Sequence, residues 1–456
     1  MKVKTRFAPS PSGGLHIGGA RTALFNYLYA KSKKGDFLVR IEDTDVSRTS
    51  QESIDSIVEG LNWLKIKFDS KIAFQRNNID NHLNFAESLI SKGLAYKCYY
   101  TNEELQTFKR RGKFVSKWRN ISPRNNKLKQ PYTIRLKIPH NENLIINDLV
   151  QGNVEVKSNE LDDCILVRSD KKPTFMLASV VDDINMGITH IIRGDDHLTN
   201  TFRQLFLYKF SQKRIPVFAH IPLILNEEGK KLSKRDKIPS ILDLKKEGYL
   251  DEAISNYLLR LGWSYKNQEI LNIKESIKVF DIESVGKSPA KLDKSKINFL
   301  NEYYLKNIPK NVIFDLYKNF LKDSEKEILE ELESNLFENF EQFLERATTL
   351  KDLTIKTNYL FAFSGLSKEN WVLIENKMNY INNLVVELKL LDKWKKEQIE
   401  KTIKTYVNKS NIKFFDVGMP LRFLLTNNNK TPSLFVIMVI LGKKEVIRRL
   451  ENVIIK

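Results

Sequence analysis

The chain has 456 residues, of which 41% are hydrophobic, and this length predicts several globular domains rather than one core. Its formal net charge of +19 suits a protein that binds polyanions, because phosphate neutralisation is the main source of nucleic-acid affinity, although a general bias toward lysine would give the same charge. With only Cys98 and Cys164, the sequence excludes a disulfide framework and a cysteine-rich zinc cage, and it favours a reducing cytoplasm. The N-terminus lacks a signal-peptide pattern and the longest apolar run, "LFVIMVIL", is too short to cross a bilayer, so we expect a cytoplasmic protein without a membrane segment.

The first part of the chain alternates strand-like and helix-like patterns, which predicts a parallel sheet with crossover helices. The expected strands are residues 3–9 and 37–45, and the expected helices are residues 20–35, 50–66 and 81–94.

The sequence pattern changes between about residues 97 and 174, where a charged helical pattern at 101–114 precedes alternating strand patterns at 132–139 and 152–158. We interpret this stretch as a small α+β insertion. The alternation of strand and helix patterns then resumes with a strand at 189–197, a helix at 200–210 and a strand at 218–225. The lysine-rich loop "NEEGKKLSKRDK" follows.

The last part of the chain predicts helices, since runs such as 252–263, 325–350 and 383–407 carry helical spacing of apolar residues. No convincing strand pattern follows residue 245, and no internal repeat or low-complexity linker is present. We expect one or two compact helical bundles.

The loop "PSPSGGLHIGG" joins the first strand, which we expect to end near Ala8, to a helix beginning near Gly18. A helix N-terminus at the end of a parallel strand presents backbone N–H groups and a positive dipole, which together form an anion site. His16 adds a side-chain donor, while Gly18 and Gly19 allow a ligand to approach the backbone. The loop matches neither a P-loop nor a G-x-G-x-x-G pattern, and taken alone it could be an ordinary turn.

A second cluster, "GKKLSKR", crowds Lys230, Lys231, Lys234 and Arg235 around Ser233 on the loop after a strand. A charge run of this kind is usually a solvated surface. Its pairing with the first motif favours a functional role instead.

The two motifs resemble the signature motifs of class I aminoacyl-tRNA synthetases, in the form used by glutamyl- and glutaminyl-tRNA synthetases. The stretches "RFAPSP", "ARTALFNYL", "RIEDTD", "VVDD", "IIRGDDH", "GYLDEAISNYLLRLGWS" and "GKSPAKLD" resemble bacterial glutamyl-tRNA synthetases in the same order. The resemblance is strong over roughly the first 300 residues and weak in the C-terminal third.

The resemblance implies an α/β Rossmann-type class I synthetase catalytic domain with an α+β insertion, followed by an all-α C-terminal anticodon-binding region. Its expected divisions are the two catalytic halves at 1–96 and 175–229, the acceptor-end insertion at 97–174, a signature-loop and stem-contact domain at 230–311, and the anticodon-binding region at 312–456. The enzyme would be a monomer.

The implied reaction activates L-glutamate with ATP and transfers the glutamyl group to the terminal adenosine of tRNA(Glu). Whether tRNA(Gln) is charged as well is left open by the resemblance. The attacking carboxylate is already ionised, so the reaction needs positioning and positive charge rather than a protein nucleophile. His16, Lys231 and Lys234 would be catalytic, and the ATP site would consist of His16, Gly18, Gly19, Lys231, Ser233, Lys234 and Asp196. Asp196 could equally be a solvated acid at a strand end. Mg²⁺ should accompany ATP, with phosphates and waters as most of its ligands.

Glutamate differs from glutamine only in its distal carboxylate, which a fixed arginine can select. Arg6 and Arg193 each end a predicted strand, and we assign one to each carboxylate of glutamate; the alternative is an arginine paired with an internal aspartate. By resemblance, Glu42 would bind the substrate ammonium group. The resemblance adds pocket positions Ala8, Ser10, Phe175 and Ser179. Asp43 and Asp45 would fix the loop through backbone hydrogen bonds rather than touch the substrate.

The resemblance also places Arg48 at the tRNA end and Arg346 near an anticodon-discriminating position. Several residues depart from the family pattern. Phe175 stands where relatives commonly have a tyrosine, Gly19 replaces the last histidine of the fuller signature, and "DKIPSI" replaces "HGA" after the second motif. Where some relatives bind zinc through a C-x-C pair, this chain has only Cys98, so we predict no zinc.

Three other functions compete with this interpretation. A glutaminyl-tRNA synthetase carries C-terminal β-barrels, whereas residues 312–456 have helical patterns throughout, and a glutamyl-queuosine synthetase would lack the C-terminal half. A catalytically inactive tRNA-binding paralogue would not need the intact His16, Lys231, Lys234, Arg6 and Arg193.

Overall fold

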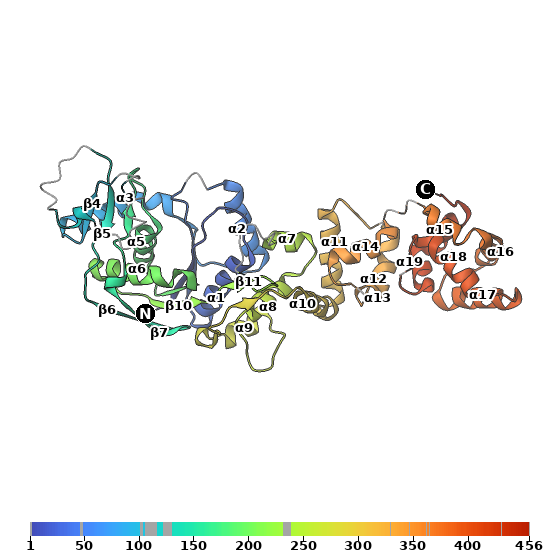
Figure 1. Ribbon diagram of the computed structural model, residues 1–456. Helices are drawn as coiled ribbons and strands as arrows, with labels where there is room; N and C mark the ends of the chain where they lie inside the picture. The colour runs from blue at the N-terminus through green and yellow to red at the C-terminus, as the bar shows by residue number, and fades with distance from the viewer. Residues whose placement is uncertain are drawn as a thin grey trace. The chain divides into compact units, whose positions relative to one another are not determined.

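The computed structural model describes residues 2–45, 49–100, 104, 116–121, 130–230, 239–328, 330–345, 347–361, 363, 365–429 and 431–455 (Figure 1). The chain divides into two compact units. The first contains residues 1–244 and 251–294, and the second contains residues 245–250 and 295–456. This division is coarser than the predicted domains, whose boundaries stay a prediction.

The first unit is built around parallel strands. Strand β1 (Lys4–Phe7) pairs in parallel with β2 (Asp36–Ile41), which pairs with β3 (Ala73–Phe74). Strand β9 (His190–Gly194) pairs in parallel with β10 (Val217–Ile221). The Thr189 N–H donates to the Lys4 carbonyl at 3.0 Å, which sets β9 beside β1 and aligns the ends of these strands. The predicted parallel arrangement is therefore present.

Helices cover this sheet. They are α1 (Ile17–Ser32), α2 (Gln51–Trp63), α3 (Ile79–Ser91), α5 (Phe175–Met186) and α6 (Leu198–Ser211). Helix α1 contacts β1, β2, β9 and α8 (Asp251–Arg260), and it is buried around most of its circumference because its residues are apolar on nearly every side. The core between α3, α5, α6 and the strands includes Leu89, Leu177, Phe206 and Phe218.

The segment predicted as an insertion contains two sheet elements. Strands β4 (Ala95–Cys98), β5 (Thr133–Leu136) and β8 (Ile165–Val167) form a small antiparallel sheet. The hairpin of β6 (Asn143–Asp148) and β7 (Gly152–Lys157) instead joins the catalytic sheet, since β6 pairs in parallel with β10. The helix predicted at 101–114 lies, apart from residue 104, outside the described residues. The hairpin thus brings the middle of the chain to the strand ends.

The rest of the first unit closes the N-terminal loop. Helices α7 (Ile241–Lys246), α8 (Asp251–Arg260) and α9 (Ile273–Val279) follow β11 (Ile224–Leu225). Strand β12 (Ala290–Lys291) pairs in parallel with β11, so the prediction that no strand follows residue 245 is wrong in this detail; two residues are too few to leave an alternating pattern. The Ile241 N–H donates to the Leu15 carbonyl at 2.8 Å, and a β-bridge joins His16 to Ser240. The chain after the lysine-rich loop therefore returns to the loop before α1.

The second unit is helical, as predicted. Its helices are α10 (Lys294–Asn307), α11 (Lys310–Asp323), α12 (Glu330–Asn339), α13 (Glu341–Leu344), α14 (Leu350–Lys356), α15 (Lys368–Val372), α16 (Met378–Lys389), α17 (Lys396–Lys409), α18 (Phe415–Thr426) and α19 (Leu434–Glu451). Its core includes aromatic rings packed edge to face, with the ring centroids of Phe314 and Phe340 4.9 Å apart. Short 3₁₀ helices lie at Gln75–Asn78, Lys117–Asn120, Ser158–Glu160, Asp195–His197, Ile282–Ser284, Asn358–Leu360 and Glu375–Lys377. Within the described ranges, no helix combines the length and apolarity needed to cross a bilayer.

Candidate active site

Polar side chains gather at the carboxyl ends of the parallel strands. Arg6, Arg40, Arg193 and His220 are each the penultimate residue of their strands, β1, β2, β9 and β10. Arg193 lies directly beside His220 in the strand register. All four side chains are buried. Because this edge is where ligands bind in open α/β sheets, a cluster of buried cations here points to an anionic ligand.

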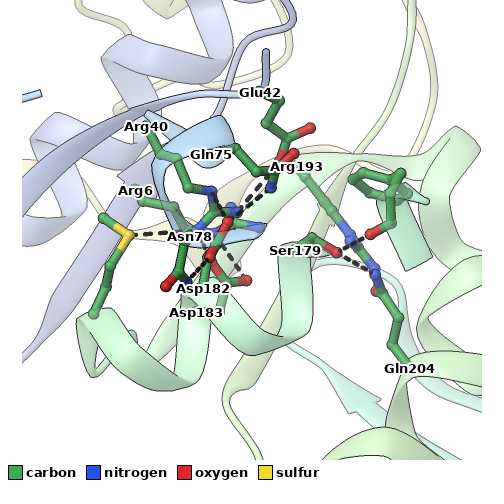
Figure 2. A network of polar contacts seen from close by, with 12 residues as sticks. Arg6, Arg40, Glu42, Gln75, Asn78, Ser179, Asp182, Asp183, Arg193 and Gln204 are labelled. Atoms are coloured by element: carbon green, nitrogen blue, oxygen red, sulfur yellow. Dashed lines mark hydrogen bonds and ion pairs between the residues drawn. The ribbon is translucent and has the colours of Figure 1, made fainter. Parts of the chain in front are cut away.

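Asp183 of α5 joins the first two arginines (Figure 2). The Arg6 Nε lies 3.2 Å and 3.3 Å from the two carboxylate oxygens of Asp183, and Arg40 Nη1 donates to Asp183 Oδ1. In the described part of the chain, no group hydrogen-bonds either Nη atom of Arg6. The pairing with an internal aspartate, weighed above as the alternative for Arg6, is therefore present, but it uses only Nε. The two Nη atoms of Arg6 stay available to bind a carboxylate.

A second acid of α5, Asp182, anchors the other side of this network. It accepts hydrogen bonds from Gln75 Nε2 at 2.8 Å and from Asn78, and it lies 2.7 Å from the Nε2 of the buried His82. Ser179, Asp182 and Asp183 lie at helical spacings of three and four residues, so one face of α5 carries all three. Figure 2 shows these three side chains among the labelled arginines.

The arginines control the charge of these acids. Burial alone would raise the pKa of Asp183, but the Arg40 and Arg6 guanidinium groups outweigh it and hold that pKa below its usual value. Burial also opposes the charge of Arg40, but the surrounding Asp183, Glu42 and Asp182 raise its pKa. Burial raises the pKa of Glu42, because Arg40 and Arg6 compensate for only part of its lost hydration. The network therefore holds Asp183 ionised.

Glu42, the predicted partner of the substrate ammonium group, directly follows β2. Its N–H donates to the Pro9 carbonyl at 2.9 Å, which brings the loop holding Ala8 and Ser10 against the end of β2. Its carboxylate contacts Arg40 Nη2 at 3.3 Å. Asp43 accepts from the Arg76 backbone N–H at 2.8 Å, which confirms the predicted loop-fixing role of that residue.

Arg193 has a different environment from Arg6. Its Nε lies 3.3 Å from His220 Nε2, and its Nη2 donates to Thr201 at 2.5 Å and to Gln204 Oε1 at 2.8 Å. No carboxylate among the described residues forms an ion pair with it. Burial, with repulsion from Arg6 added, lowers its pKa to about 10. A buried guanidinium surrounded by neutral partners is costly unless a ligand supplies the anion.

The remaining pocket residues are brought together by α5 and α6. Ser179 donates to the Phe175 carbonyl at 2.6 Å and accepts from Gln204 Nε2 at 2.8 Å, so Ser179 is linked to Arg193 through Gln204. The Phe175 ring lies 5.0 Å from the His197 ring. Burial and the nearby Arg193 lower the pKa of His197 to about 4, so this histidine is neutral near pH 7. These contacts connect α5 with Arg193 and with the turn before α6.

The loop before α1, predicted above to bind an anion, places His16 at the start of the helix. His16 is the N-cap of α1, and its Nδ1 accepts from the Gly19 N–H at 3.1 Å. Because Nδ1 accepts, the proton of the neutral ring belongs on Nε2, which can donate to an anion. A Cβ on Gly18 would lie 3.3 Å from the His16 ring, so glycine keeps the approach to this imidazole open.

Some of the predicted residues cannot be placed. Lys231, Ser233, Lys234, Arg48 and Arg346 lie outside the described residues. Lys230 is described, and its N–H donates to the Asn226 side chain at 2.8 Å. Asp196 is exposed, and its carboxylate lies against Gly194 at the end of β9. No group of three or more His, Cys, Asp or Glu residues is placed to hold a metal ion in the regions that the structure describes.

Sequence reasoning assigned no role to several residues of the site: Arg40, Asp148, Asp182, Asp183, Thr201, Gln204 and His220. The signal for two of them was visible, because "LASVVDDINM" places adjacent acids in an otherwise apolar helical run. Charged residues are rarely buried without a partner. The sequence therefore indicates that these two aspartates pair with arginines, but it does not indicate which arginines.

Comparisons with known proteins agree with this geometry. The family model for the catalytic domain of class I tRNA synthetases (E and Q) matches residues 2–299, and the anticodon binding domain model matches residues 310–454. Curated relatives include glutamate–tRNA ligase 2 of Wolbachia pipientis subsp. Culex pipiens, 41% identical with 99% of each chain covered. Another is the glutamate–tRNA ligase of Pelagibacter ubique, 41% identical with 100% of this chain and 99% of the relative covered.

A solved structure shows the same fold. The crystal structure of a glutamate tRNA ligase from Elizabethkingia meningosepticum, in complex with its amino acid, matches with a TM-score of 0.85 and 32% identity over 99% of both chains. This likeness confirms the predicted fold class, a Rossmann-type catalytic domain followed by a helical region. The chain belongs to the class I tRNA synthetases, in the group that contains the glutamate–tRNA ligases.

Proposed function

We propose that this chain is a glutamate–tRNA ligase, which activates L-glutamate with ATP and attaches it to the terminal adenosine of tRNA(Glu). The observation that carries this proposal is the pair of buried arginines at adjacent strand ends, of which Arg193 has no carboxylate partner among the residues described. A dicarboxylic substrate supplies two anions for two such cations. The names of the full-length relatives support the same activity.

In the first step, a carboxylate oxygen of glutamate attacks the α-phosphate of ATP, and pyrophosphate leaves. In the second step, a ribose hydroxyl of the terminal adenosine attacks the glutamyl carbonyl, and AMP leaves. Neither step needs a protein nucleophile, so the work of the protein is alignment and charge stabilisation. We assign the phosphates to His16, Gly18 and Gly19, with Lys231, Ser233 and Lys234 from the second motif and Asp196 at the nucleotide. One pre-aligned donor of this type contributes roughly 3 kcal/mol, or about a hundredfold in rate.

Selection of glutamate follows from the same pocket. Arg6 and Arg193 would each hold one carboxylate, and Glu42 would hold the ammonium group, with Ala8, Ser10, Phe175 and Ser179 lining the site. Glutamine would present an amide N–H₂ to an arginine, which leaves a buried cation unneutralised. A site built to satisfy that cation should therefore reject glutamine strongly.

The partners of the reaction extend beyond the pocket. We assign the acceptor end of the tRNA to the insertion and Arg48, and the anticodon to the helical unit with Arg346, in agreement with the anticodon-domain match. Mg²⁺ bound to ATP would neutralise phosphate charge, and phosphate oxygens and waters would supply most of its ligands. We propose a zinc-free monomer that acts in the cytoplasm.

The test is aminoacylation by the purified protein, with labelled glutamate and labelled glutamine offered separately on tRNA(Glu) and tRNA(Gln). Glutamate on tRNA(Glu) alone would support a discriminating ligase. Glutamate on tRNA(Gln) as well would add the wider tRNA specificity. If no amino acid is charged and ATP does not exchange with pyrophosphate in the presence of tRNA and glutamate, the proposal is wrong and an inactive tRNA-binding paralogue takes its place.

Two variants test the assigned roles. Lys234→Ala should damage the chemical step far more than tRNA binding, and Arg6→Ala should raise the glutamate KM or abolish amino-acid selection. Wild-type kinetics in either variant would remove that residue from its role. The affinity for tRNA should also fall steeply with salt, because many phosphates are contacted.

A further inference from the structure

A buried histidine–aspartate pair lies behind Arg193. Asp148 ends β6, the first strand of the hairpin that joins the catalytic sheet, and its carboxylate lies 2.6 Å from Nδ1 of His220 on β10. Both side chains are fully buried. Asp148 also accepts from the backbone N–H groups of Val150 and Gln151 at 2.9 Å and of His220 at 3.0 Å. The pair therefore links two strands and a tight turn directly beneath the pocket.

These contacts determine the tautomer of His220. Burial alone would raise the pKa of Asp148, but hydrogen bonds from His220 and the backbone outweigh it and lower that pKa, so the carboxylate is ionised and can only accept. Nδ1 of His220 must then carry the proton. In the neutral ring, Nε2 is an acceptor, and it faces Arg193 Nε at 3.3 Å and the Thr201 hydroxyl at 2.9 Å.

We propose that Asp148 and His220 are positioning residues that orient Arg193 toward the substrate carboxylate. The inference rests on the proposed role of Arg193 in binding glutamate. His220 holds Nε, and Thr201 and Gln204 hold Nη2, so the protein restrains two nitrogens of the guanidinium. Nη1 makes no hydrogen bond with the described residues, and it is the atom left for the ligand. Asp148 acts on Arg193 only through the ring that it orients.

A protonated His220 would reverse this arrangement, because an N–H on Nε2 would point at the N–H of Arg193. The charged or titratable groups that face His220 are Asp148 on β6, Arg193 on β9, and Asp195 and His197 in the turn before α6. Burial and Arg193 disfavour the second proton, whereas Asp148 and Asp195 favour it, and the net effect lowers the pKa of His220. The ring is therefore neutral near pH 7.

Three substitutions separate positioning from packing. In His220→Asn, the amide N–H can still reach Asp148, but the acceptor for Arg193 is lost. In His220→Gln, the longer side chain can return an amide oxygen to Arg193. Asp148→Asn keeps the shape of the side chain. The three backbone N–H groups hold the amide oxygen of the asparagine, so its amide N–H faces Nδ1 of His220. Nδ1 must then accept, and the ring proton moves to Nε2.

The assay measures KM for glutamate, KM for ATP and kcat in aminoacylation of tRNA(Glu), together with the thermal midpoint of unfolding. Because one hydrogen bond to a charged group is lost, His220→Asn and Asp148→Asn should raise the glutamate KM about tenfold, with the ATP KM within about twofold of wild type. His220→Gln should return the glutamate KM to within about threefold. The matched control is His190→Asn, at the other end of β9, where the ring contacts Thr189 and Tyr29 rather than Arg193.

The outcomes are distinct. A wild-type enzyme that charges glutamate, with glutamate KM unchanged in both His220→Asn and Asp148→Asn, overturns the positioning role and leaves the proposed function intact. Equal increases in the KM values for glutamate and ATP would show that Asp148 and His220 have a purely structural role. A glutamate KM that stays high in His220→Gln would show the same. Either result also overturns the positioning role. If the wild-type protein does not charge glutamate and glutamate does not raise its thermal midpoint, the proposed function itself is wrong. If His220→Asn does not fold, the isosteric Asp148→Asn still decides the question.

Discussion

Arg6 and Arg193 occupy equivalent places at the ends of adjacent strands, but their surroundings differ in charge. Arg6 shares Asp183 with Arg40, and Asp182 and Glu42 lie beside them. Among the described residues, Arg193 hydrogen-bonds only with neutral groups, namely His220, Thr201 and Gln204. The first cluster supplies its cations with carboxylates from the fold and leaves the Nη atoms of Arg6 for a ligand, whereas the second leaves a buried cation whose counter-ion must come from a ligand. The proposed pocket thus combines an arginine held in an ion network with an arginine that contacts neutral groups among the described residues.

The largest expected effect breaks the structural cluster. Asp183→Asn removes the carboxylate that Arg6 and Arg40 share and leaves two buried cations poorly neutralised. Loss of one partner of a buried ion pair costs about 3–5 kcal/mol, so denaturant unfolding should show a loss of this size. The control is Asp55→Asn, whose hydrogen-bond partner among the described residues is Gln51 on the surface of α2, and it should change stability by less than about 0.5 kcal/mol. Equal stability of the two variants would contradict the assignment of Asp183 to the fold.

The second prediction concerns the ligand-dependent cluster. Arg193→Met removes a buried cation that has no counter-ion in the described chain, so relief of the desolvation cost should offset the three lost hydrogen bonds and stability should change by about 1 kcal/mol or less. Charging with glutamate should fall at least about a hundredfold in kcat/KM, because a substrate carboxylate is left unpaired. Unfolding measurements and steady-state kinetics on the same preparation check both parts. A loss of stability as large as that of Asp183→Asn would erase the distinction between the two arginines.

The third prediction uses pH. Burial lowers the folded-state pKa of His197 to about 4, below the ordinary value of 6.5, so between these values the unfolded chain binds a proton that the folded chain does not. Stability should therefore fall as pH decreases from about 6.5 to about 4 and should be unaffected by this residue above pH 6.5. The pKa difference of about 2.5 corresponds to about 3.4 kcal/mol, which solvent screening of the partly exposed ring reduces to about 1–2 kcal/mol. His190 and His220 also have lowered pKa values and act in the same direction.

Denaturant unfolding at several pH values tests this expectation, with His197→Asn as the comparison. The variant should show a shallower slope between pH 6.5 and 4. The carboxylates Asp183 and Asp148, whose pKa values are lowered, should lose their contribution only below about pH 4, which separates their effect from that of the histidines. An unchanged slope in the variant would remove His197 as a source of the pH dependence.

The smallest expected effect refines the pocket wall. Phe175→Tyr places a hydroxyl beside His197, whose ring lies 5.0 Å from the phenylalanine ring, and this hydroxyl could donate to a substrate carboxylate. The glutamate KM should fall by about threefold to tenfold, as one added hydrogen bond of roughly 1 kcal/mol implies. Phe210→Tyr on α6, against Phe206, is the matched control and should leave the KM unchanged. An increase in KM would show that the pocket has no room for the hydroxyl.

The sequence by itself determined the ordered motifs, the parallel strands, the helical second unit and the two arginines at strand ends, because local periodicity and turn residues are visible along a single chain. Only the tertiary structure decided which charges meet. Asp183 lies 177 residues from Arg6, and Asp148 lies 72 residues from His220, and no local pattern relates such positions. Arg6 and Arg193 differ because folding brings a distant carboxylate against Arg6 but, among the described residues, not against Arg193. Burial in a low-dielectric core makes this difference in charge pairing affect both the stability of the fold and the binding of a ligand.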